Sequence, residues 1–230
     1  MKISIIIPCF NEEKTLSKIV DKVLKFKLYD KEIIIVDDCS KDNTPTIIND
    51  LILKFNEIKS IKHDKNYGKG AGIKSGVKMA TGDIILIQDA DLEYNPEDYN
   101  SLLEPFLKTD ADVVYGSRFL GGKYVRLSFF WHYVANRILT TLCNTFTNLN
   151  MTDMETGYKL FKSDAIKSID LKEKSFGIEP EITVKLAKKK YIFYEVPISY
   201  SGRSYDEGKK IGLKDAFIAI YCIIKYKYFD

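Results

Sequence analysis

The chain of 230 residues is 45% hydrophobic and 29% charged, which is typical of a globular protein with a sizeable core. Its net charge of +3 and its lack of a dense basic block argue against nucleic-acid binding, which requires many cations to meet the phosphates. The four cysteines form no C-x-x-C pair and are typical of reduced thiols in a cytosolic protein. No segment approaches the roughly 20 apolar residues of a membrane span. We therefore expect a protein that is soluble or lies on a membrane without crossing it.

In the first half of the chain, apolar runs of strand length alternate with segments whose apolar residues recur at helical spacing. This alternation predicts an α/β fold of stacked βα units, with a mostly parallel central sheet and flanking helices. The predicted strands are residues 3–7, 33–36, 58–62, 83–87 and 112–115. The predicted helices are residues 13–26, 44–55, 70–80 and one that begins at Pro96.

The alternation ends near residue 120, where Gly121 and Gly122 mark a loop. We place a boundary there, between residues 1–120 and 121–230 of a single domain. Two further helices are predicted, in the aromatic-rich segment 127–148 and the apolar run 216–224. Each of them either packs on the core or lies in a membrane interface, where aromatic and basic residues are common anchors.

The most informative motif is an Asp-x-Asp that directly follows an apolar strand. Residues two apart in an extended segment point the same way, so Asp89 and Asp91 can offer oxygens to one hard cation. Mg²⁺ or Mn²⁺ is the expected cofactor, because such ions are held by one or two carboxylates together with substrate phosphates. The alternative is that the two residues only end a buried strand and begin a turn.

Two other polar segments follow predicted strands, and the carboxyl ends of parallel strands line a common crevice. At the second of them, a carboxylate at Asp37 or Asp38 can accept from the ring N–H of uracil or from the donor edge of guanine. Phe10, in the first segment, can border the base. The glycine-rich residues 68–72 precede a helix and can bring N–H groups and Lys69 toward a phosphate. Their spacing is not that of a Walker A loop.

Five ordered motifs together resemble a family 2 glycosyltransferase and, within it, the dolichol-phosphate mannose synthase group. They are residues 6–13, 35–44, 66–70, 89–91 and 115–119. The resemblance covers nearly the whole chain and implies the GT-A fold, a Rossmann-like fold of nucleotide-diphospho-sugar transferases. It also implies a nucleotide-diphosphate-sugar donor, a divalent cation and inversion at the anomeric carbon. Residues 1–120 would then bind the nucleotide sugar, and residues 121–230 would bind the acceptor and carry candidate interfacial helices.

The resemblance also implies site residues. The positions that match nucleoside binding are Pro8, Phe10, Glu12 and Asp37, and those of the diphosphate-metal motif are Asp89, Ala90 and Asp91. Phosphate contacts of donor or acceptor fall on Arg118, Arg203 and Lys209. To the donor site we add Asp38 and Lys69, to the metal ligands Glu93, and to the acceptor-phosphate contacts Arg126. Glu179 either touches the sugar or orients an arginine.

The acceptor decides whether a general base is needed. A sugar hydroxyl loses a proton as it attacks, whereas a phosphate monoester is already anionic and needs cations to hold it. Arg118 and Arg126 supply cations of the kind suited to bidentate phosphate contacts. Glu155 is a candidate base, although a capping role in the turn before residues 158–161 explains it equally well.

We therefore predict a metal-dependent, inverting glycosyltransferase that moves mannose or glucose from GDP-mannose or UDP-glucose to a polyprenyl or dolichyl phosphate. Its catalytic residues are Asp89, Asp91, Arg118 and Glu155, and it works at the cytoplasmic face of a membrane through peripheral contact. One alternative is transfer to a glycan hydroxyl in cell-surface polysaccharide synthesis, with Glu155 or Asp153 as base. Another is a non-catalytic nucleotide-sugar-binding subunit. For the oligomeric state the sequence makes no prediction.

Overall fold

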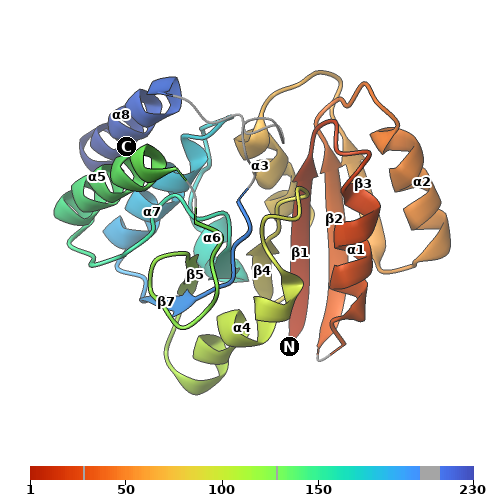
Figure 1. Cartoon of the computed structure of the whole chain (residues 1–230), viewed down its shortest axis with the longest axis horizontal. Coiled ribbons are helices and arrows are strands. Elements are labelled where there is room, and N and C mark those ends of the chain that lie inside the picture. Colours follow the sequence, from red (N-terminus) through yellow and green to blue (C-terminus); the bar gives the residue numbers. More distant parts are fainter. Residues whose placement is uncertain (28, 128, 203–212) are drawn as a thin grey trace.

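The computed structural model describes residues 1–27, 29–127, 129–202 and 213–230. Within them one sheet has the strand order β3-β2-β1-β4-β6-β5-β7 (Figure 1). The strands are β1 (Lys2–Cys9), β2 (Asp30–Asp37), β3 (Ile58–Lys62), β4 (Ile84–Ile87), β5 (Val113–Ser117), β6 (Lys159–Lys162) and β7 (Phe193–Pro197). Strands β3, β2, β1 and β4 are parallel, as are β5 and β7, whereas β6 is antiparallel to both of its neighbours. The predicted α/β class with a mostly parallel sheet is confirmed.

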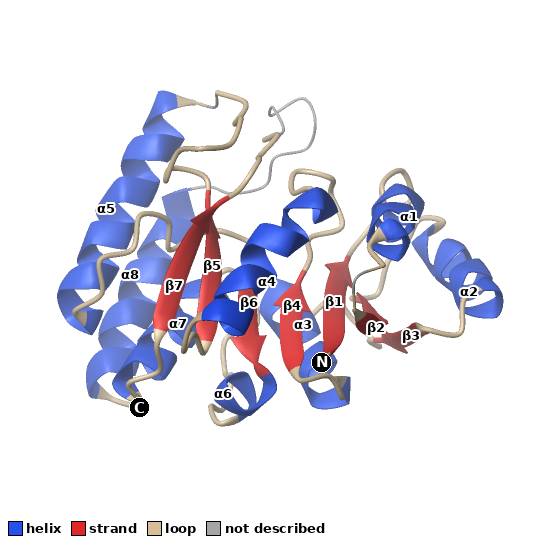
Figure 2. Cartoon of the chain, turned by 90° about the horizontal axis from the view of Figure 1, so that it is seen from below, coloured by secondary structure: helices blue, strands red, loops and turns tan. Residues whose placement is uncertain are grey.

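Helices cover both faces of this sheet (Figure 2). They are α1 (Leu16–Lys25), α2 (Thr44–Lys54), α3 (Lys69–Met79), α4 (Tyr99–Lys108), α5 (Phe130–Thr147), α6 (Ser163–Lys167), α7 (Ile178–Lys188) and α8 (Leu213–Tyr228), with a short 3₁₀ helix, η1 (Pro96–Asp98). Side chains alternate along a strand, so Ile5 and Ile7 of β1 pack with α1, α2 and α4, and Ile6 packs with the helices of the other face. Two apolar cores, one on each side, therefore hold the sheet.

The predicted element bounds need one correction near the first strand. The helix predicted over residues 13–26 begins only at Leu16, because the backbone N–H groups of Glu12 and Glu13 bond to the loop after β2. Glu12 donates to Thr44 Oγ1 at 2.9 Å and Glu13 to Asp42 Oδ2 at 3.2 Å. The first two loops at the carboxyl edge of the sheet are thus tied together.

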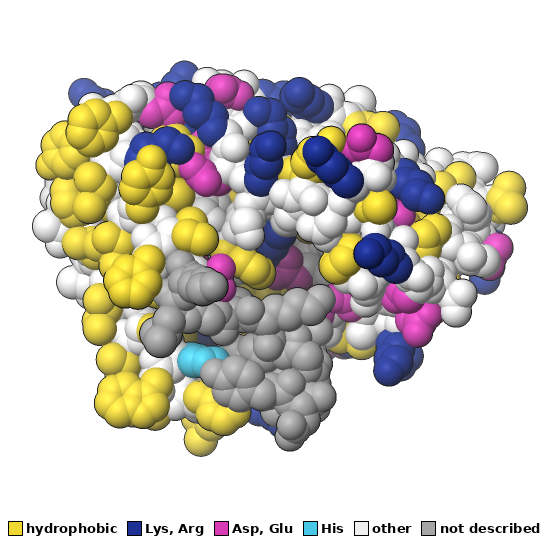
Figure 3. Space-filling model, turned by 90° about the horizontal axis from the view of Figure 1, so that it is seen from above, with side chains coloured by type: hydrophobic (Ala, Val, Ile, Leu, Met, Phe, Trp, Pro, Cys, Tyr) yellow, Lys and Arg dark blue, Asp and Glu magenta, His cyan; other side chains and the backbone are white. Residues whose placement is uncertain are grey.

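Helices α5 and α8 pack against each other, and each leaves apolar side chains in solvent. We call this surface the apolar face, formed by Phe130, Trp131, Ile138, Phe217, Tyr221 and Tyr228. Figure 3 shows hydrophobic side chains gathered along the edge of the molecule where these helices lie. The opposite sides of both helices are buried, at Asn136, Leu139 and Cys143 in α5 and at Ala219, Cys222 and Ile223 in α8. Both helices therefore pack on the core and also expose apolar surface. No helix within the described residues has the length and hydropathy of a membrane span.

Candidate active site

The loops after β1, β2 and β4 lie at the carboxyl ends of neighbouring parallel strands, as the sequence predicted. Each loop contains a non-glycine residue with positive φ, namely Asn11 at 57°, Cys39 at 65° and Leu92 at 65°. Such backbone conformations cost on the order of 1–3 kcal/mol and cluster at functional sites. In Figure 3 a hollow with acidic and basic side chains opens at the centre of the upper face.

Asp37 ends β2 and is only 2% exposed. Its Oδ1 accepts from Ser40 N at 2.9 Å, but its Oδ2 is buried with no hydrogen-bond partner among the described residues. A buried acceptor without a donor costs about 1–3 kcal/mol. An N–H on the edge of a nucleobase would satisfy this oxygen, so Asp37 retains its assignment as the candidate base contact.

Asp38 has structural contacts that the sequence did not predict. One oxygen lies 2.7 Å from His63 Nδ1, and the carboxylate also accepts from Tyr67 N and Gly68 N, at 2.9 and 2.7 Å. His63 in turn contacts Ser75 Oγ of α3 at 2.9 Å. These bonds use both carboxylate oxygens, so Asp38 holds the loop that leads into α3. Its contact with the donor stays a prediction.

The other nucleoside candidates, Pro8 and Phe10, are half-buried at the end of β1. Ala90, of the predicted diphosphate-metal motif, is buried after β4. The Glu12 carboxylate accepts from Thr15 Oγ1 at 2.6 Å, one turn away. Glu12 therefore has a local structural contact in addition to any contact with a nucleoside.

Lys69, the first residue of α3, lies between two carboxylates. Its Nζ is 2.9 Å from Asp89 Oδ1 and 3.2 Å from Glu179 Oε1 of α7. Burial lowers the pKa of Lys69, but Asp89 and Glu179 outweigh burial and hold that pKa above its ordinary value. Gly157 packs on the same carboxylate, because a Cβ at Gly157 would overlap Oδ2 of Asp89. The first aspartate of the motif is thus fixed by α3 and by the segment before β6.

The donor set of the motif fits a hard cation that arrives with a diphosphate. Asp89 and Asp91 supply carboxylate oxygens, and Mg²⁺ is usually bound by one or two carboxylates plus substrate phosphates. Glu93, the predicted third ligand, also has a structural contact, because its Oε2 accepts from Tyr200 OH at 2.8 Å. Metal binding by this carboxylate stays a prediction. The described part of the chain contains no group of three or more histidine, cysteine, aspartate or glutamate residues placed to hold a metal.

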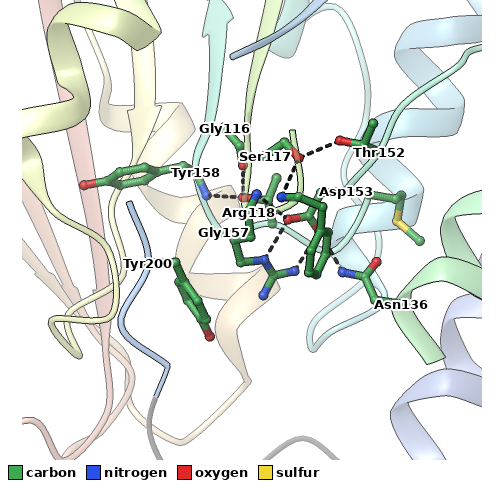
Figure 4. Close-up of polar contacts among 12 residues, drawn as sticks. Gly116, Ser117, Arg118, Asn136, Thr152, Asp153, Gly157, Tyr158 and Tyr200 are labelled. Carbon is green, nitrogen blue, oxygen red and sulfur yellow. Dashed lines mark hydrogen bonds and ion pairs between the residues drawn. The ribbon is translucent and has the colours of Figure 1, made fainter. Parts of the chain in front are cut away.

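Arg118 follows β5 and forms a buried ion pair with Asp153 (Figure 4). Its Nε and Nη2 donate to the two carboxylate oxygens, each at 2.7 Å, and its backbone N donates at 3.1 Å. Asn136 of α5 adds a bond of 2.8 Å to the same carboxylate. Burial raises the pKa of Asp153, but Arg118 outweighs burial and holds that pKa below its ordinary value. Asp153, which the sequence offered as an alternative general base, is therefore held in an ion pair with Arg118.

The two arginines predicted to bind acceptor phosphate both contact Tyr200. The Arg118 guanidinium lies 5.1 Å from the centre of the Tyr200 ring. Arg126 donates from its backbone N to Tyr200 O at 2.8 Å and from Nη1 to Gly202 O at 3.1 Å. A cavity of about 380 Å³ next to them is lined by residues that include Glu93, Tyr124, Arg126 and Tyr200. Arg203 and Lys209 lie outside the described residues.

Glu155 and Glu179 each have a buried carboxylate oxygen, Oε1 and Oε2 respectively, without a hydrogen-bond partner among the described residues. Lys159 is 1% exposed and donates from Nζ to Met154 O at 2.8 Å and to Thr156 O. Burial and the nearby Glu179 raise the pKa of Glu155 to about 8. Burial lowers the pKa of Lys159 to about 8, against the opposing effect of Glu179 and Glu155. Burial therefore favours the protonated form of Glu155.

Sequence reasoning missed several of these contacts. Lys159 had a signal, since it is a lysine inside an apolar strand, where a charge requires a partner. Tyr200 and Gly157 had none, because their neighbours in space are far away in the chain. Lys69, predicted as one donor contact among many, instead joins two carboxylates from opposite halves of the chain.

The mostly parallel sheet and the loops at its carboxyl edge fit the GT-A fold, and comparison with known proteins agrees. Residues 4–170 match the description Glycosyl transferase family 2, and the chain belongs to this family. It is 30% identical over 217 residues to the dolichol-phosphate mannosyltransferase of Pyrococcus furiosus, covering 92% of this chain and 60% of that protein. It is 29% identical over 242 residues to the UDP-N-acetylglucosamine–dolichyl-phosphate N-acetylglucosaminyltransferase of Methanococcus voltae, covering 98% and 96%.

Solved structures show the same fold. Glucosyl-3-phosphoglycerate synthase from Mycobacterium tuberculosis, in complex with Mn²⁺, UDP and glucosyl-3-phosphoglycerate, superimposes with a TM-score of 0.74 at 17% identity. The match covers 98% of this chain and 79% of the synthase. Another structure of that synthase contains Mg²⁺ and UDP. The predicted family and GT-A fold are confirmed.

Proposed function

We propose that this chain is an inverting, metal-dependent glycosyltransferase that moves a hexose from a nucleotide-diphosphate sugar to a polyprenyl or dolichyl phosphate. The two curated relatives are named for sugar transfer involving dolichyl phosphate, one with mannose and the other with N-acetylglucosamine. The chain spans only 60% of the first of these proteins, so its whole activity belongs to the proposal. Mannose and glucose remain the predicted sugars, and the second relative adds N-acetylglucosamine to those worth testing.

The state of the two candidate bases carries the choice of acceptor. Asp153 is bound in an ion pair with Arg118. Burial raises the pKa of Glu155, which disfavours the carboxylate form that a base requires. A hydroxyl acceptor needs a general base, whereas an anionic phosphate acceptor needs cations. Arg118, fixed in orientation by Asp153, is a cation of this kind. These observations support a phosphate acceptor over a glycan hydroxyl.

Each residue of the site then has a defined role in the reaction. Asp37 accepts from the ring N–H of the nucleobase, and Asp89 and Asp91 face the diphosphate. A divalent cation held by these two aspartates would neutralise the negative charge that develops on the departing nucleoside diphosphate. Arg118 holds the acceptor phosphate so that one of its oxygens attacks the anomeric carbon from the side opposite the leaving group. The bond to the phosphate oxygen forms, the bond to the diphosphate oxygen breaks, and the configuration inverts.

The apolar face supports a peripheral position on the cytoplasmic side of a membrane, where the lipid phosphate would be reached. Helix α5 exposes Phe130 and Trp131, while Asn136, one to two turns further along, bonds to Asp153. Five residues of helix span only about 7.5 Å. A membrane-bound α5 would therefore place the Arg118 ion pair close to the level of lipid phosphates.

The test uses one lipid in two forms. Radiolabelled sugar transfer from GDP-mannose, UDP-glucose and UDP-N-acetylglucosamine is measured to a short polyprenyl phosphate and to the matching polyprenol, with Mg²⁺ or Mn²⁺ and with chelator. We expect transfer to the phosphate alone, loss with chelator, loss in Asp91→Asn, and retention in Glu155→Gln. Transfer to polyprenol or to a glycan that is lost in Glu155→Gln would replace this proposal with the hydroxyl-acceptor function. Donor binding without any transfer would favour a non-catalytic subunit.

A further inference from the structure

Two of the three buried side-chain oxygens without a partner in the described residues belong to Glu155 and Glu179. The third, on Asp37, lies at the end of the site that would meet the nucleobase. Buried polar atoms in folded proteins are nearly always hydrogen-bonded, to protein, water or ligand. Two buried carboxyl oxygens without partners therefore indicate a ligand group that can form hydrogen bonds with both.

The Glu179 carboxylate lies beside the diphosphate end of the site, because Lys69 joins it to Asp89 with Nζ distances of 3.2 and 2.9 Å. Glu155 belongs to the same segment as Gly157, which packs on the Asp89 carboxylate two residues further along. The charge of Glu179 also acts on Glu155, so the two carboxyl groups are near each other. The group attached to the diphosphate of a nucleotide sugar is the sugar ring.

Acidic groups outnumber basic groups in this region. Its carboxyl groups include Asp89, Asp91, Asp153, Glu155, Glu179 and Glu195, and its cations among the described residues are Lys69, Arg118 and Lys159. A neutral ligand adds no charge, whereas a further carboxylate would add a buried anion without a cation to pair with, which is strongly unfavourable.

We infer that Glu155 and Glu179 form the subsite for the sugar ring of the donor, and that this subsite accepts uncharged sugars and rejects uronic acids. Glu179 acts as an anion that accepts bonds from sugar hydroxyls, and Glu155 acts as a neutral acid. Glutamine imitates a neutral acid in shape and hydrogen bonding but does not replace an anion. The inference rests on the proposed nucleotide-sugar donor.

Glu179 and the exposed Asp50 of α2 allow a matched comparison in the 230-residue chain. Dissociation constants are measured for UDP and GDP and for UDP-glucose, UDP-N-acetylglucosamine, GDP-mannose and UDP-glucuronate, all with Mg²⁺. We expect Glu179→Gln to weaken binding of the preferred sugar nucleotide at least tenfold and to leave its nucleoside diphosphate within twofold. Asp50→Asn should stay within threefold for both. UDP-glucuronate should bind the wild-type chain no more tightly than UDP.

Each other result would overturn the inference. Equal weakening of sugar nucleotide and nucleoside diphosphate in Glu179→Gln would show a structural role through Lys69. Unchanged sugar-nucleotide binding in that variant, or tight binding of UDP-glucuronate, would remove the sugar subsite. These measurements contain no lipid, so they are independent of the acceptor. Absence of any nucleoside-diphosphate binding to the wild-type chain would defeat the proposed donor class and this inference with it.

Discussion

The ion pair of Arg118 and Asp153 makes a quantitative prediction for Asp153→Asn. The substitution keeps the shape of the side chain but removes the charge that faces the guanidinium at 2.7 Å. Removing one partner of a buried pair costs about 3–5 kcal/mol, because the other charge stays buried without compensation. The Asp153 side chain is fully buried and that of Arg118 is 15% exposed. Some solvent screening therefore remains, and we take the lower end, about 3 kcal/mol.

For a domain of this size, 1 kcal/mol corresponds to roughly 2–4 °C in the melting temperature, so Asp153→Asn should melt about 6–12 °C lower. Urea and thermal unfolding followed by circular dichroism measure this, since the only tryptophan, Trp131, is exposed and a poor fluorescence probe. Asp50→Asn, on the exposed side of α2, is the matched control and should change stability by less than about 0.5 kcal/mol.

A double-mutant cycle separates the pair from its surroundings. If the ion pair dominates, Arg118→Met combined with Asp153→Leu should destabilise the chain by clearly less than the sum of the two single changes. Stability of Asp153→Asn within about 0.5 kcal/mol of the wild type would refute the reasoning. Strictly additive single changes would refute it as well.

Three further outcomes follow from other contacts. Gly157→Ala places a Cβ against Asp89 Oδ2 and should lower the transfer rate at least tenfold; a rate equal to that of the wild type would contradict this. Gly121→Ala meets no atom within 4 Å and strains only its own backbone, at a φ of 81°, so it should lose some stability but keep its transfer rate. The pKa of Glu155 in the folded chain is raised to about 8, so its stabilising contribution is complete at low pH and is lost as pH rises through 8. Between pH 5 and pH 8, the unfolding free energy of Glu155→Gln should therefore fall less than that of the wild type. If urea unfolding gives the same pH dependence for both proteins, Glu155 does not bind a buried proton. The double variant Phe217→Ser and Tyr221→Ser should reduce flotation with anionic liposomes. Leu53→Ser removes an apolar side chain that is also exposed, on α2, and should not reduce flotation. Equal flotation of the double variant and the wild type would remove α8 from the membrane contact.

Local patterns predicted the strands and helices well because periodicity records which side chains are buried. Apolar runs such as residues 33–36 predict where the strands lie in the chain. Because the carboxyl ends of parallel strands lie at one edge of a sheet, the loops after them are expected there together. The place of β6 was not predictable in this way. Its residues 159–162 read as an ordinary strand, and nothing in them shows that it inserts antiparallel between β4 and β5.

Side-chain roles failed where partners are distant in the chain. Asp38 and Asp37 are adjacent and chemically identical, yet one accepts from three donors of the loop before α3 while the other keeps an unsatisfied oxygen. Asp153 is one of several acidic residues in its loop, and its pairing with Arg118 depends on how β5 and α5 pack. Residue type predicted that these groups carry charge, but only packing determines which charges meet.

The contacts of Asp89 show why the two halves of the chain function as one unit. Asp89 belongs to residues 1–120, yet Gly157 packs on its carboxylate and Glu179 binds the lysine that contacts it. Strand β5 of the first half pairs with β6 and β7 of the second, so one continuous sheet holds both sets of residues. Arg118, the proposed acceptor contact, is paired with Asp153 of the second half, and Asn136 bonds to the same carboxylate. The proposed metal, sugar and acceptor sites all depend on this junction between the halves. A change in the packing of α5 or α7 on the sheet should therefore affect donor and acceptor binding together.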